Sequence, residues 1–545
     1  MNQSNEEHQR NIIHQSEPSQ PCSTRATVPT RKEVDDAVNL LKSGKSAGID
    51  RFTIELFKYG GEQISIWLHS VISHIWITKK IPHEFTEAII ILLHKKGDRR
   101  ICHNARPISL LSIPGRVLMK IIQTRVEKKV ELHLRDNQNG FRSKRGTGDS
   151  IFGVHQVIEK TREYNKHLYV LSIDFSKAFD CISREKLWTV LPQYDIDEEI
   201  TTLIRNIYNG STARIQLNSG AISEPFNITS GVRQGCILSP LLFSIIINEI
   251  MREATQNLSD KESYLYLNNS RLYDFDYADD LAIFSESLEG LEALYREVKK
   301  VASDWLLKIN CSKTKIMHIC RSDTNIQNGT TVSLDGDSFE AINSFKYLGS
   351  IISRDGSSRP NVEKRIMMGN TVFQRMKTFF RRKRASLHLR KRVFNTCVLS
   401  VLLYGSESWT LTPALYSKLE SFQNQCLRDM LNLTWEDKIS NKELHQRVPG
   451  YTSIASLIRR RRLRWFGKLL NMEESRICKQ LLKWKPEGRR PRGRPPKSWI
   501  SQVQKDLQKS DIVEFTELLK NGIPEGVAWS DVWWIILSSD WTELS

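Results

Sequence analysis

Three aspartates have the type and the spacing expected of a site for metal ions. Asp279 and Asp280 are adjacent in a Tyr-Ala-Asp-Asp tetrapeptide with β-type residues on both sides. Asp174 lies near the end of another apolar, β-type run at residues 168–175. Carboxylates brought together repel one another and raise one another's pKa, so such a cluster needs bound cations. Mg²⁺ prefers these hard oxygen ligands, and two such ions can promote an in-line phosphoryl displacement.

An isolated Asp-Asp pair is more often part of a surface turn, because Asp favours turns. The context favours chemistry instead. Residues 171–180 read Leu-Ser-Ile-Asp-Phe-Ser-Lys-Ala-Phe-Asp, residues 231–240 read Gly-Val-Arg-Gln-Gly-Cys-Ile-Leu-Ser-Pro, and residues 276–280 read Asp-Tyr-Ala-Asp-Asp. These blocks, in this order, resemble the palm motifs of reverse transcriptases. The surrounding sequence, over about residues 34–355, resembles the non-LTR (LINE-type, RTE-like) retrotransposon branch and includes Gly140-Phe141-Arg142.

The resemblance implies an RNA-directed DNA polymerase that extends a DNA 3′-hydroxyl on an RNA template with two Mg²⁺ ions, for which Mn²⁺ could substitute. The implied catalytic residues are Asp174, Asp279 and Asp280, with the carbonyl of Phe175 as a further metal ligand. Phe179 would reject a 2′-hydroxyl, Gln234 and Gly235 would line the nucleotide pocket, and Arg106 and Lys95 would meet the triphosphate. The implied primer grip is Phe345, Tyr347, Leu348 and Gly349. Core packing is the alternative role for Phe179 and for the aromatic residues of the primer grip.

The pattern of apolar residues predicts the elements that position these side chains. Thr30 and Glu33 have the spacing of a capping box before a helix, and residues 54–81 keep a helical spacing. Residues 88–93 predict a buried strand, followed by a hairpin-like stretch at 94–98 and a proline-marked loop at 106–108. Further strands are expected at 168–175 and on both sides of 277–280. The expected fold is α+β, a right-hand polymerase of fingers, palm and thumb with a helical, basic C-terminal extension.

The chain divides by composition. Residues 1–29 are polar and predict a disordered segment. The resemblance assigns residues 30–355 to fingers and palm and residues 356–470 to the thumb and a helical basic region, and it leaves 471–545 as an extension. That extension contains Pro-Arg-Gly-Arg-Pro-Pro, which cannot be helical and resembles an AT-hook core and a nuclear-localisation patch equally well. A flexible linker is the third alternative.

The formal net charge of +18 favours a polyanionic partner. The arginines predicted to contact phosphates are Arg381, Arg382, Arg384, Arg462, Arg464, Arg492 and Arg494. A solvated charged face is the alternative. The predicted partners are an RNA template, a DNA primer or nicked target DNA, and dNTPs.

The 9 cysteines lack a CxxC pair or a His-rich partner cluster. This argues against a zinc module and against a disulfide framework, and favours an intracellular protein in the cytosol or nucleus. No apolar run approaches the roughly 20 residues that span a bilayer, and no membrane is expected. Related elements usually carry an endonuclease ahead of the polymerase, and none is evident in this chain, which would suit a truncated copy. An inactive remnant that only binds nucleic acid is therefore the alternative function, whereas Phe179 argues against an RNA-templated RNA polymerase.

Overall fold

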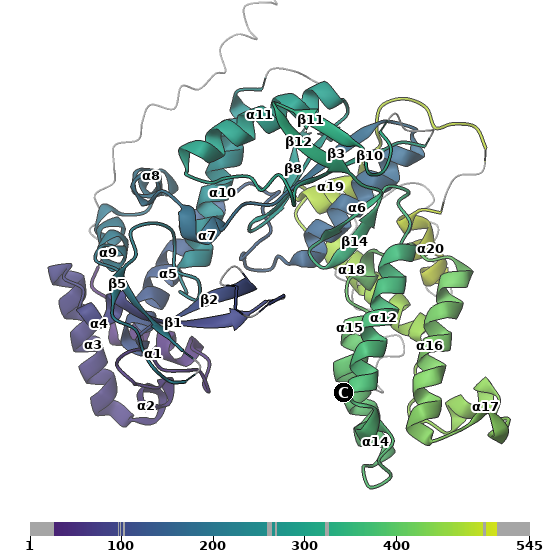
Figure 1. The fold of residues 1–545 in the computed structure, drawn as a ribbon, viewed down its shortest axis with the longest axis horizontal. Helices are drawn as coiled ribbons and strands as arrows, with labels where there is room; N and C mark the ends of the chain where they lie inside the picture. Colours follow the sequence, from purple (N-terminus) through teal and green to yellow (C-terminus); the bar gives the residue numbers. More distant parts are fainter. Residues whose placement is uncertain are drawn as a thin grey trace, which may run out of the picture. The chain divides into compact units, whose positions relative to one another are not determined.

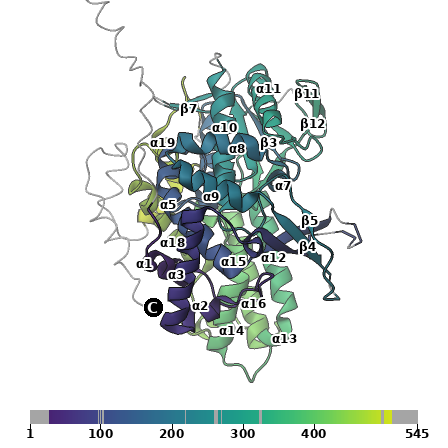
Figure 2. The same ribbon diagram turned by 90° about the vertical axis from the view of Figure 1, so that its left-hand side faces the viewer.

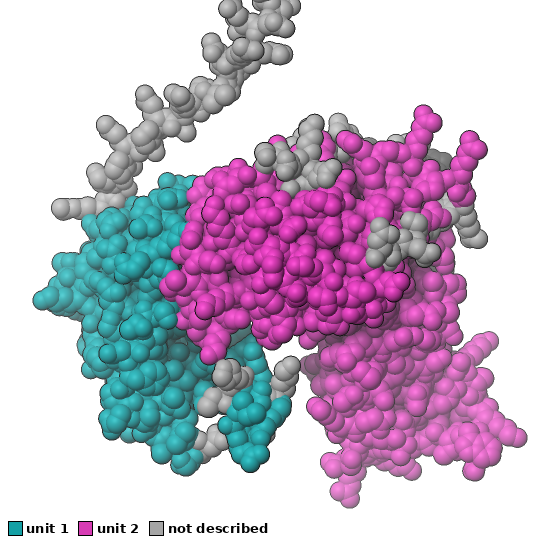
Figure 3. All heavy atoms as spheres, turned by 45° about the horizontal axis from the view of Figure 1, so that its top comes forward, with its two compact units in different colours: residues 1–133, 183–242 teal, residues 134–182, 243–545 magenta. Residues whose placement is uncertain are grey.

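The computed structural model describes residues 27–508, except for 96, 99, 102–103, 218, 259–263, 268–269, 322–325 and 494–496. The chain forms two compact units, which Figure 3 shows in different colours. Unit 1 comprises residues 1–133 and 183–242, and unit 2 comprises residues 134–182 and 243–545. Most of the predicted disordered segment and half of the predicted extension lie outside the described residues.

Unit 1 combines helices with a mixed sheet of four strands in the order β2-β1-β4-β5. Its strands are β1 (Glu87–His94), β2 (Ala105–Leu110), β4 (Thr212–Gln216) and β5 (Phe226–Asn227). Its helices are α1 (Arg31–Leu40), α2 (Ile54–Tyr59), α3 (Gly61–Thr78), α4 (His83–Thr86), α5 (Ile113–His133), α8 (Arg184–Val190), a 3-10 helix at Leu191–Tyr194, and α9 (Glu198–Tyr208). α1 packs on both α3 and α5, and Figures 1 and 2 show α1, α2 and α3 grouped together.

The first helix begins where the sequence predicts. The Thr30 hydroxyl accepts a hydrogen bond from the Glu33 backbone N–H, and the Glu33 carboxylate accepts one from the Thr30 N–H, which confirms the capping box. The continuous helix expected over residues 54–81 is instead two helices. The break falls at Gly60 and Gly61, and Gly61 has a φ of 78°, a backbone conformation that favours glycine.

The stretch from Arg106 to Ile108 is a strand and not the loop that its proline predicts. β2 pairs antiparallel with β1, and Pro107 lies opposite Leu92. β2 is at the edge of its sheet. An edge strand tolerates proline, because the missing N–H can face the open side of the sheet. β1 and β2 are consecutive strands that pair antiparallel, which agrees with the hairpin-like character predicted after residue 93.

Unit 2 is built on a sheet of six strands in the order β11-β12-β10-β3-β9-β8. These strands are β3 (Leu168–Ile173), β8 (Asp274–Tyr277), β9 (Asp280–Ser285), β10 (Lys315–Ile319), β11 (Thr331–Leu334) and β12 (Asp337–Ala341). Two smaller sheets pair β6 (Leu265–Leu267) with β7 (Ser270–Leu272) and β13 (Ser344–Tyr347) with β14 (Ser350–Ser353). α6 (Thr147–Glu163) packs against β8, and α11 (Leu288–Asp304) packs against β3 and β9. The expected α+β class with a central sheet is confirmed.

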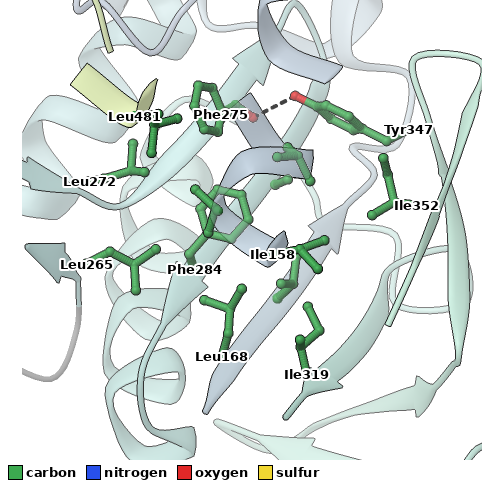
Figure 4. Packing of buried hydrophobic residues seen from close by; sticks show 14 of the residues in the cluster. Ile158, Leu168, Leu265, Leu272, Phe275, Phe284, Ile319, Tyr347, Ile352 and Leu481 are labelled. Atoms are coloured by element: carbon green, nitrogen blue, oxygen red, sulfur yellow. Dashed lines mark hydrogen bonds between the residues drawn. The ribbon is translucent and has the colours of Figure 1, made fainter. Parts of the chain in front are cut away.

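The core of unit 2 brings the strands together with distant helices. Figure 4 shows Leu168 of β3, Phe284 of β9 and Ile319 of β10 packed with Ile158 of α6. Leu481 belongs to the same cluster, although it comes from α19 (Ile477–Lys483), near the end of the described chain. The sheet is therefore held from one side by residues far apart in the sequence.

Helices follow the sheet along the chain, as the sequence predicts for residues beyond 355. They are α12 (Arg359–Arg375), α13 (Lys377–Phe380), α14 (Leu387–Val393), a π-helix at Phe394–Leu399, α15 (Ser400–Leu402), α16 (Pro413–Leu431), α17 (Asn441–Gln446), α18 (Ile454–Leu470), α19 and α20 (Trp499–Gln508). α12 and α16 pack together, and Figure 1 shows them side by side. The short helix α7 (Ala178–Cys181) follows Asp174, and the longer helix α10 (Ser239–Gln256) spans the boundary between the units at residues 242 and 243. None of the described helices combines the length and the apolar character needed to cross a membrane.

Candidate active site

The Asp279-Asp280 pair lies in the tight connection between β8 and β9. Tyr277 pairs with Asp280 across the antiparallel ladder, so the turn consists of Ala278 and Asp279. Ala278 has a φ of 57°, an unusual value for a residue with a side chain, at a cost of about 1 kcal/mol. The β-hairpin predicted from the flanking residues is thus present, and Asp279 stands at its tip.

Asp174 follows the central strand and lies beside this hairpin. β3 and β9 are antiparallel, and their last pair joins Ile173 to Leu281. The same register continued by one step places Asp174 opposite Asp280. Directly opposite residues in such a ladder have Cα atoms about 4.5–5.5 Å apart. β3 and β9, which are about a hundred residues apart in the sequence, therefore bring their carboxylates together at the same end of the two strands.

The three carboxylates act on one another electrostatically. Loss of surrounding water, followed by the charges of Asp279 and Asp174, raises the pKa of Asp280 to about 6, and the charge of Lys346 opposes this shift. The Asp280 side chain is exposed, so water screens part of the effect. Mutual repulsion of this kind is expected where carboxylates are arranged for cations. Lys346 comes from β13, in the predicted primer-grip hairpin.

Asp174 is held by the segment that precedes β10. The Thr314 hydroxyl accepts a hydrogen bond from the Asp174 N–H at 3.2 Å, and the Asp174 carbonyl accepts one from the Asn310 N–H at 2.7 Å. Nζ of Lys313 lies 3.0 Å from the Asp174 carboxylate, whereas Nζ of Lys315 pairs with Glu340 at 2.8 Å. Of these two lysines, Lys313 is thus the one beside the aspartates.

Among the described residues, one group of three has its potential ligand atoms within 4.8 Å of one another: His167, His318 and Cys320. The carboxylate oxygens of the three aspartates do not all lie this close together. Lys313 supplies the positive charge beside Asp174. The chemistry of the aspartate set still suits a hard divalent cation, because all the side-chain donors are carboxylate oxygens and they gather at one sheet edge.

A buried ion network lies next to the β8–β9 hairpin and was missed by sequence reasoning. The Arg135 guanidinium contacts the Asp274 carboxylate at 2.8 Å and the Asp276 carboxylate at 2.6 Å. Both aspartates belong to β8, and both side chains are fully buried. Asn137 also donates to Asp274, at 3.0 Å. The network ties β8 to the segment that follows α5.

One arginine here serves two carboxylates, and the two respond in opposite directions. Burial alone would raise the pKa of Asp274, but the charge and hydrogen bonds of Arg135 outweigh it, and the pKa is lowered. Burial and the neighbouring Asp274 raise the pKa of Asp276 well above its usual value. Oδ1 of Asp276 is buried and has no hydrogen-bond partner among the described residues. The network therefore shifts the pKa values of two adjacent buried carboxyl groups in opposite directions.

Gly140 lets the chain approach the β8–β9 turn closely. A Cβ atom at this position would lie 2.4 Å from the backbone nitrogen of Ala278, closer than any real contact. The adjacent Asn139 donates its N–H to the Asp276 carbonyl at 3.0 Å, and Gln138 forms a parallel bridge to Asp276. Arg142 closes the segment by donating to the Gln138 carbonyl at 2.8 Å. The Gly-Phe-Arg motif thus supports the turn from behind, a role that its resemblance alone did not indicate.

Phe175 and Phe179 lie just after Asp174. The Phe175 ring is buried, so any contribution to metal binding is confined to its backbone carbonyl. Phe179 is only partly buried, and its ring stacks on that of Phe243 with centroids 4.4 Å apart and an interplanar angle of 9°. The stack fixes the orientation of the Phe179 ring and leaves part of it exposed. The steric-gate role stays a prediction.

The predicted nucleotide-binding residues outside this region belong to unit 1. Gly235 has a φ of 105°, and a Cβ atom there would lie 2.8 Å from the Ser109 carbonyl oxygen of β2. The carbonyl of Gln234 accepts a hydrogen bond from the Ser109 N–H at 2.8 Å. Arg106 of β2 and Lys95, just after β1, both have exposed side chains. The structure thus explains the glycine by close backbone packing, and the nucleotide-binding roles remain predictions.

The residues of the predicted primer grip form the β13–β14 hairpin. Leu348 and Gly349 occupy its turn, with φ values of 48° and 79°. Phe345 and Tyr347 point into the core of unit 2, and the Tyr347 hydroxyl donates to the Phe275 carbonyl at 3.0 Å, the dashed line in Figure 4. The rings fit the alternative of core packing. Any contact with a primer would then come from the turn and the exposed side of the hairpin.

Most of the predicted phosphate-binding arginines have exposed side chains: Arg381, Arg382, Arg384, Arg464 and Arg492. Arg381 also forms an ion pair with Asp429, so part of its charge is already balanced. Arg494 lies outside the described residues.

Arg462 departs from the prediction and is corrected here. Its side chain has no exposed surface and forms an ion pair with Asp506 of α20. A buried guanidinium paired in this way holds helices together and cannot reach a phosphate. The helical spacing could have indicated this burial, because Arg462 is four residues from Ile458 and from Phe466, and both lie on the buried face of α18.

Comparisons with known proteins agree with this geometry. The reverse transcriptase (RNA-dependent DNA polymerase) family matches residues 93–352, a range that includes all three aspartates. The Transposon TX1 uncharacterized 149 kDa protein of Xenopus laevis is 28% identical over 52% of this chain and 22% of its own length. The probable RNA-directed DNA polymerase from transposon BS of Drosophila melanogaster is 23% identical over 84% of this chain and 50% of its own length.

A third relative, the Pol polyprotein from the type-2 retrotransposable element R2DM of Drosophila melanogaster, is 28% identical over 43% of this chain and 21% of its own length. The chain thus spans half or less of each of these relatives. Among solved structures, apo telomerase from Candida tropicalis aligns with a TM-score of 0.38 and 12% identity over 76% of this chain and 72% of that one. Residues 93–352 form a reverse transcriptase domain, and the homologues of this chain are the RNA-directed DNA polymerases of non-LTR retrotransposons.

Proposed function

We propose that this chain is an RNA-directed DNA polymerase that extends a DNA 3′-hydroxyl on an RNA template with dNTPs. The observation that carries the proposal is the register of the central sheet. It sets Asp174 opposite Asp280 and beside Asp279, within the region that matches reverse transcriptases. A surface turn with two acidic residues would not need a third carboxylate from another strand.

Asp174 and Asp279, with the carbonyl of Phe175, would hold divalent cations, and Asp280 would complete the acidic cluster. Two bound Mg²⁺ ions, or Mn²⁺ in their place, activate a 3′-hydroxyl and stabilise the leaving pyrophosphate in this type of reaction. Two observations support the fit. Burial, followed by the charges of Asp279 and Asp174, raises the pKa of Asp280, and the carboxylate of Asp174 already attracts a cation, the ammonium group of Lys313.

The chain's own side chains have distinct tasks in this proposal. The Arg135 network and Gly140 hold the hairpin that carries Asp279. The Phe179 ring, fixed by stacking, lies five residues after Asp174 and would exclude a ribose 2′-hydroxyl. Lys313 would leave Asp174 when cations bind, and its ammonium group would then be available to the leaving pyrophosphate.

Long polyanionic partners are supported by the charge of the chain. The formal net charge is +18, and exposed arginines follow α13 and lie on α18. Such residues contact phosphates without reading bases, so binding should weaken steeply with added salt. An RNA template paired with a DNA primer would be the bound form.

The test is primer extension by the purified protein on poly(A)–oligo(dT) with dTTP, with and without Mg²⁺. We expect extension that requires the cation and that falls by at least about 1000-fold in Asp279→Ala, because a ligand for transition-state charge is lost. Duplex binding should persist in that variant. Asp304→Ala is the matched control, since it also removes one carboxylate and Asp304 is exposed at the end of α11.

Two results would contradict the proposal. Equal extension by Asp279→Ala and wild type would remove the aspartates from the chemistry. A wild-type protein that binds the duplex and never extends it would instead identify an inactive remnant that only binds nucleic acid.

A further inference from the structure

The central sheet carries a second cluster of metal-binding side chains, at the opposite end of β3 from Asp174. His167 precedes β3, His318 lies in β10, and Cys320 follows β10. β3 and β10 are antiparallel with Tyr169 opposite His318 and Leu168 opposite Ile319, so continuing the register sets His167 opposite Cys320. Alternate residues of a strand share a face, so His318 and Cys320 point to the same side.

The side chains converge as this register predicts. Nδ1 of His167 lies 3.0 Å from Nε2 of His318, and one donor atom from each of the three residues lies within 4.8 Å of the other two. In a tetrahedral zinc site with Zn–N of about 2.0–2.1 Å and Zn–S of about 2.3 Å, ligand atoms are separated by about 3.3–3.6 Å. The observed spacing is thus within a few tenths of an ångström of this value for the nitrogen pair.

We propose that His167, His318 and Cys320 bind a zinc ion or a similar transition metal, with water as the fourth ligand. The donor set of two imidazoles and one thiolate is the softer type that zinc selects, whereas the aspartates offer only oxygen. The two sites should therefore take different metals. The ion would link β3 to β10. Asp174 and Lys313 lie at the other ends of the same two strands.

The surroundings prepare the ligands for a metal. His318 is buried, and its Nδ1 receives no hydrogen bond from the described part of the chain. Arg162 donates to the Cys320 carbonyl at 2.8 Å, which holds the backbone of this residue in place.

The exposure of His167 and the fixed orientation of the His318 ring also fit a metal site. His167 is exposed, so an ion can enter from solvent, while His318 and Cys320 are buried at 4% exposure each. The Tyr169 ring stacks on the His318 ring with centroids 4.2 Å apart and an interplanar angle of 3°, which fixes the imidazole plane. No short sequence motif, such as a CxxC pair, indicates this site, because the two histidines are 151 residues apart in the sequence.

The test is cobalt and zinc binding by the full chain after its metals have been removed, in the presence of excess Mg²⁺ to occupy the aspartates. We expect about one Co²⁺ per chain with a thiolate-to-cobalt charge-transfer band in the near ultraviolet, displaced by Zn²⁺. Cys320→Ser should lose the band, and His167→Gln, which alters only an exposed side chain, should weaken zinc binding by about 10–100-fold. Zinc should raise the unfolding temperature of the wild type but not of Cys320→Ser.

Two controls isolate the site. Cys397→Ser, at a half-buried cysteine of the π-helix, and Asp279→Ala should both keep the cobalt band. A wild-type protein without the band would overturn the proposal and leave a plain hydrogen bond between His167 and His318. A band that persists in Cys320→Ser would overturn it as well, by assigning the thiolate to another cysteine.

Discussion

Removal of Arg135 is the sharpest test of how the catalytic hairpin is supported. In Arg135→Met a side chain of similar length replaces the guanidinium, and the carboxyl groups of Asp274 and Asp276 stay buried without a counter-ion. Both have no exposed surface in the wild type. The pKa of Asp276 is already raised in the wild type, so the cost falls mainly on Asp274, which must either remain ionised and unpaired or take up a proton.

Two separate arguments give the same loss in the free energy of unfolding of Arg135→Met. Breaking a buried ion pair by removing one partner costs about 3–5 kcal/mol. Protonating a carboxyl group of ordinary pKa at pH 7 costs about 4 kcal/mol, since each pH unit contributes about 1.4 kcal/mol. We therefore expect the free energy of unfolding to fall by about 4 kcal/mol at pH 7.

The pH dependence has a definite sign. In the wild type the pKa of Asp274 is lowered in the folded state, so its stabilising contribution is present above the unfolded pKa and is lost only in acid. In Arg135→Met the folded pKa of Asp274 rises above the unfolded value, so stability is lost as pH increases from about 4. The difference between the two proteins should thus shrink by about 1.4 kcal/mol for each unit from pH 7 down to pH 5.

The assay is urea unfolding followed by circular dichroism at pH 5 and pH 7, together with primer extension. The matched control is Arg296→Met, because Arg296 pairs with Asp335 at 3.2 Å while 56% of its side chain is exposed. That surface pair should contribute no more than about 1 kcal/mol. A loss below about 1 kcal/mol in Arg135→Met at pH 7, or an equal loss at both pH values, would refute the role of the network.

Three further changes test other parts of the site. Gly140→Ala should lower extension about 100-fold, because the new Cβ must displace the catalytic turn, whereas Gly146→Ala, with nothing within 4 Å, should be neutral in the same assay. Phe179→Ala should raise incorporation of ribonucleotides relative to deoxynucleotides at least about 10-fold, and an unchanged ratio would remove the steric gate. Burial raises the folded pKa of Glu159 from 4.5 to about 7, so this residue's contribution to stability is lost as pH rises through that range. Glu159→Gln should then gain up to about 3 kcal/mol at pH 8 and little at pH 4, and denaturation curves that shift equally at both pH values would contradict this.

Local sequence was sufficient wherever a short-range physical rule applies. The capping box of α1 depends on residues three positions apart, and the β8–β9 hairpin depends on β-type residues around a tight turn. The three aspartates were found because their motifs carry both residue type and order. The error at Pro107 has a related cause: proline excludes a central strand, but only the sheet order shows that β2 is at an edge.

Residue type alone was misleading where burial decides the role of a side chain. Arg462 has the same chemistry as its exposed neighbours in a basic cluster, but its face of α18 packs against α20. Arg135 carries no motif, and its importance follows from two buried carboxylates more than a hundred residues away. In both cases the free energy of a charge depends on its surroundings, which the linear sequence does not specify.

The sequence by itself determined the fold class and the types of side chain available: carboxylates of the kind that hard cations prefer, and an excess of basic residues that favours polyanions. Only the tertiary structure decided which groups meet. The register of β3 with β9 brings Asp174 to Asp280, and its register with β10 brings His167 to Cys320. The physical reason is that strand pairing joins residues by position in a sheet, so distances of a few ångströms arise between residues with no local relation in the chain.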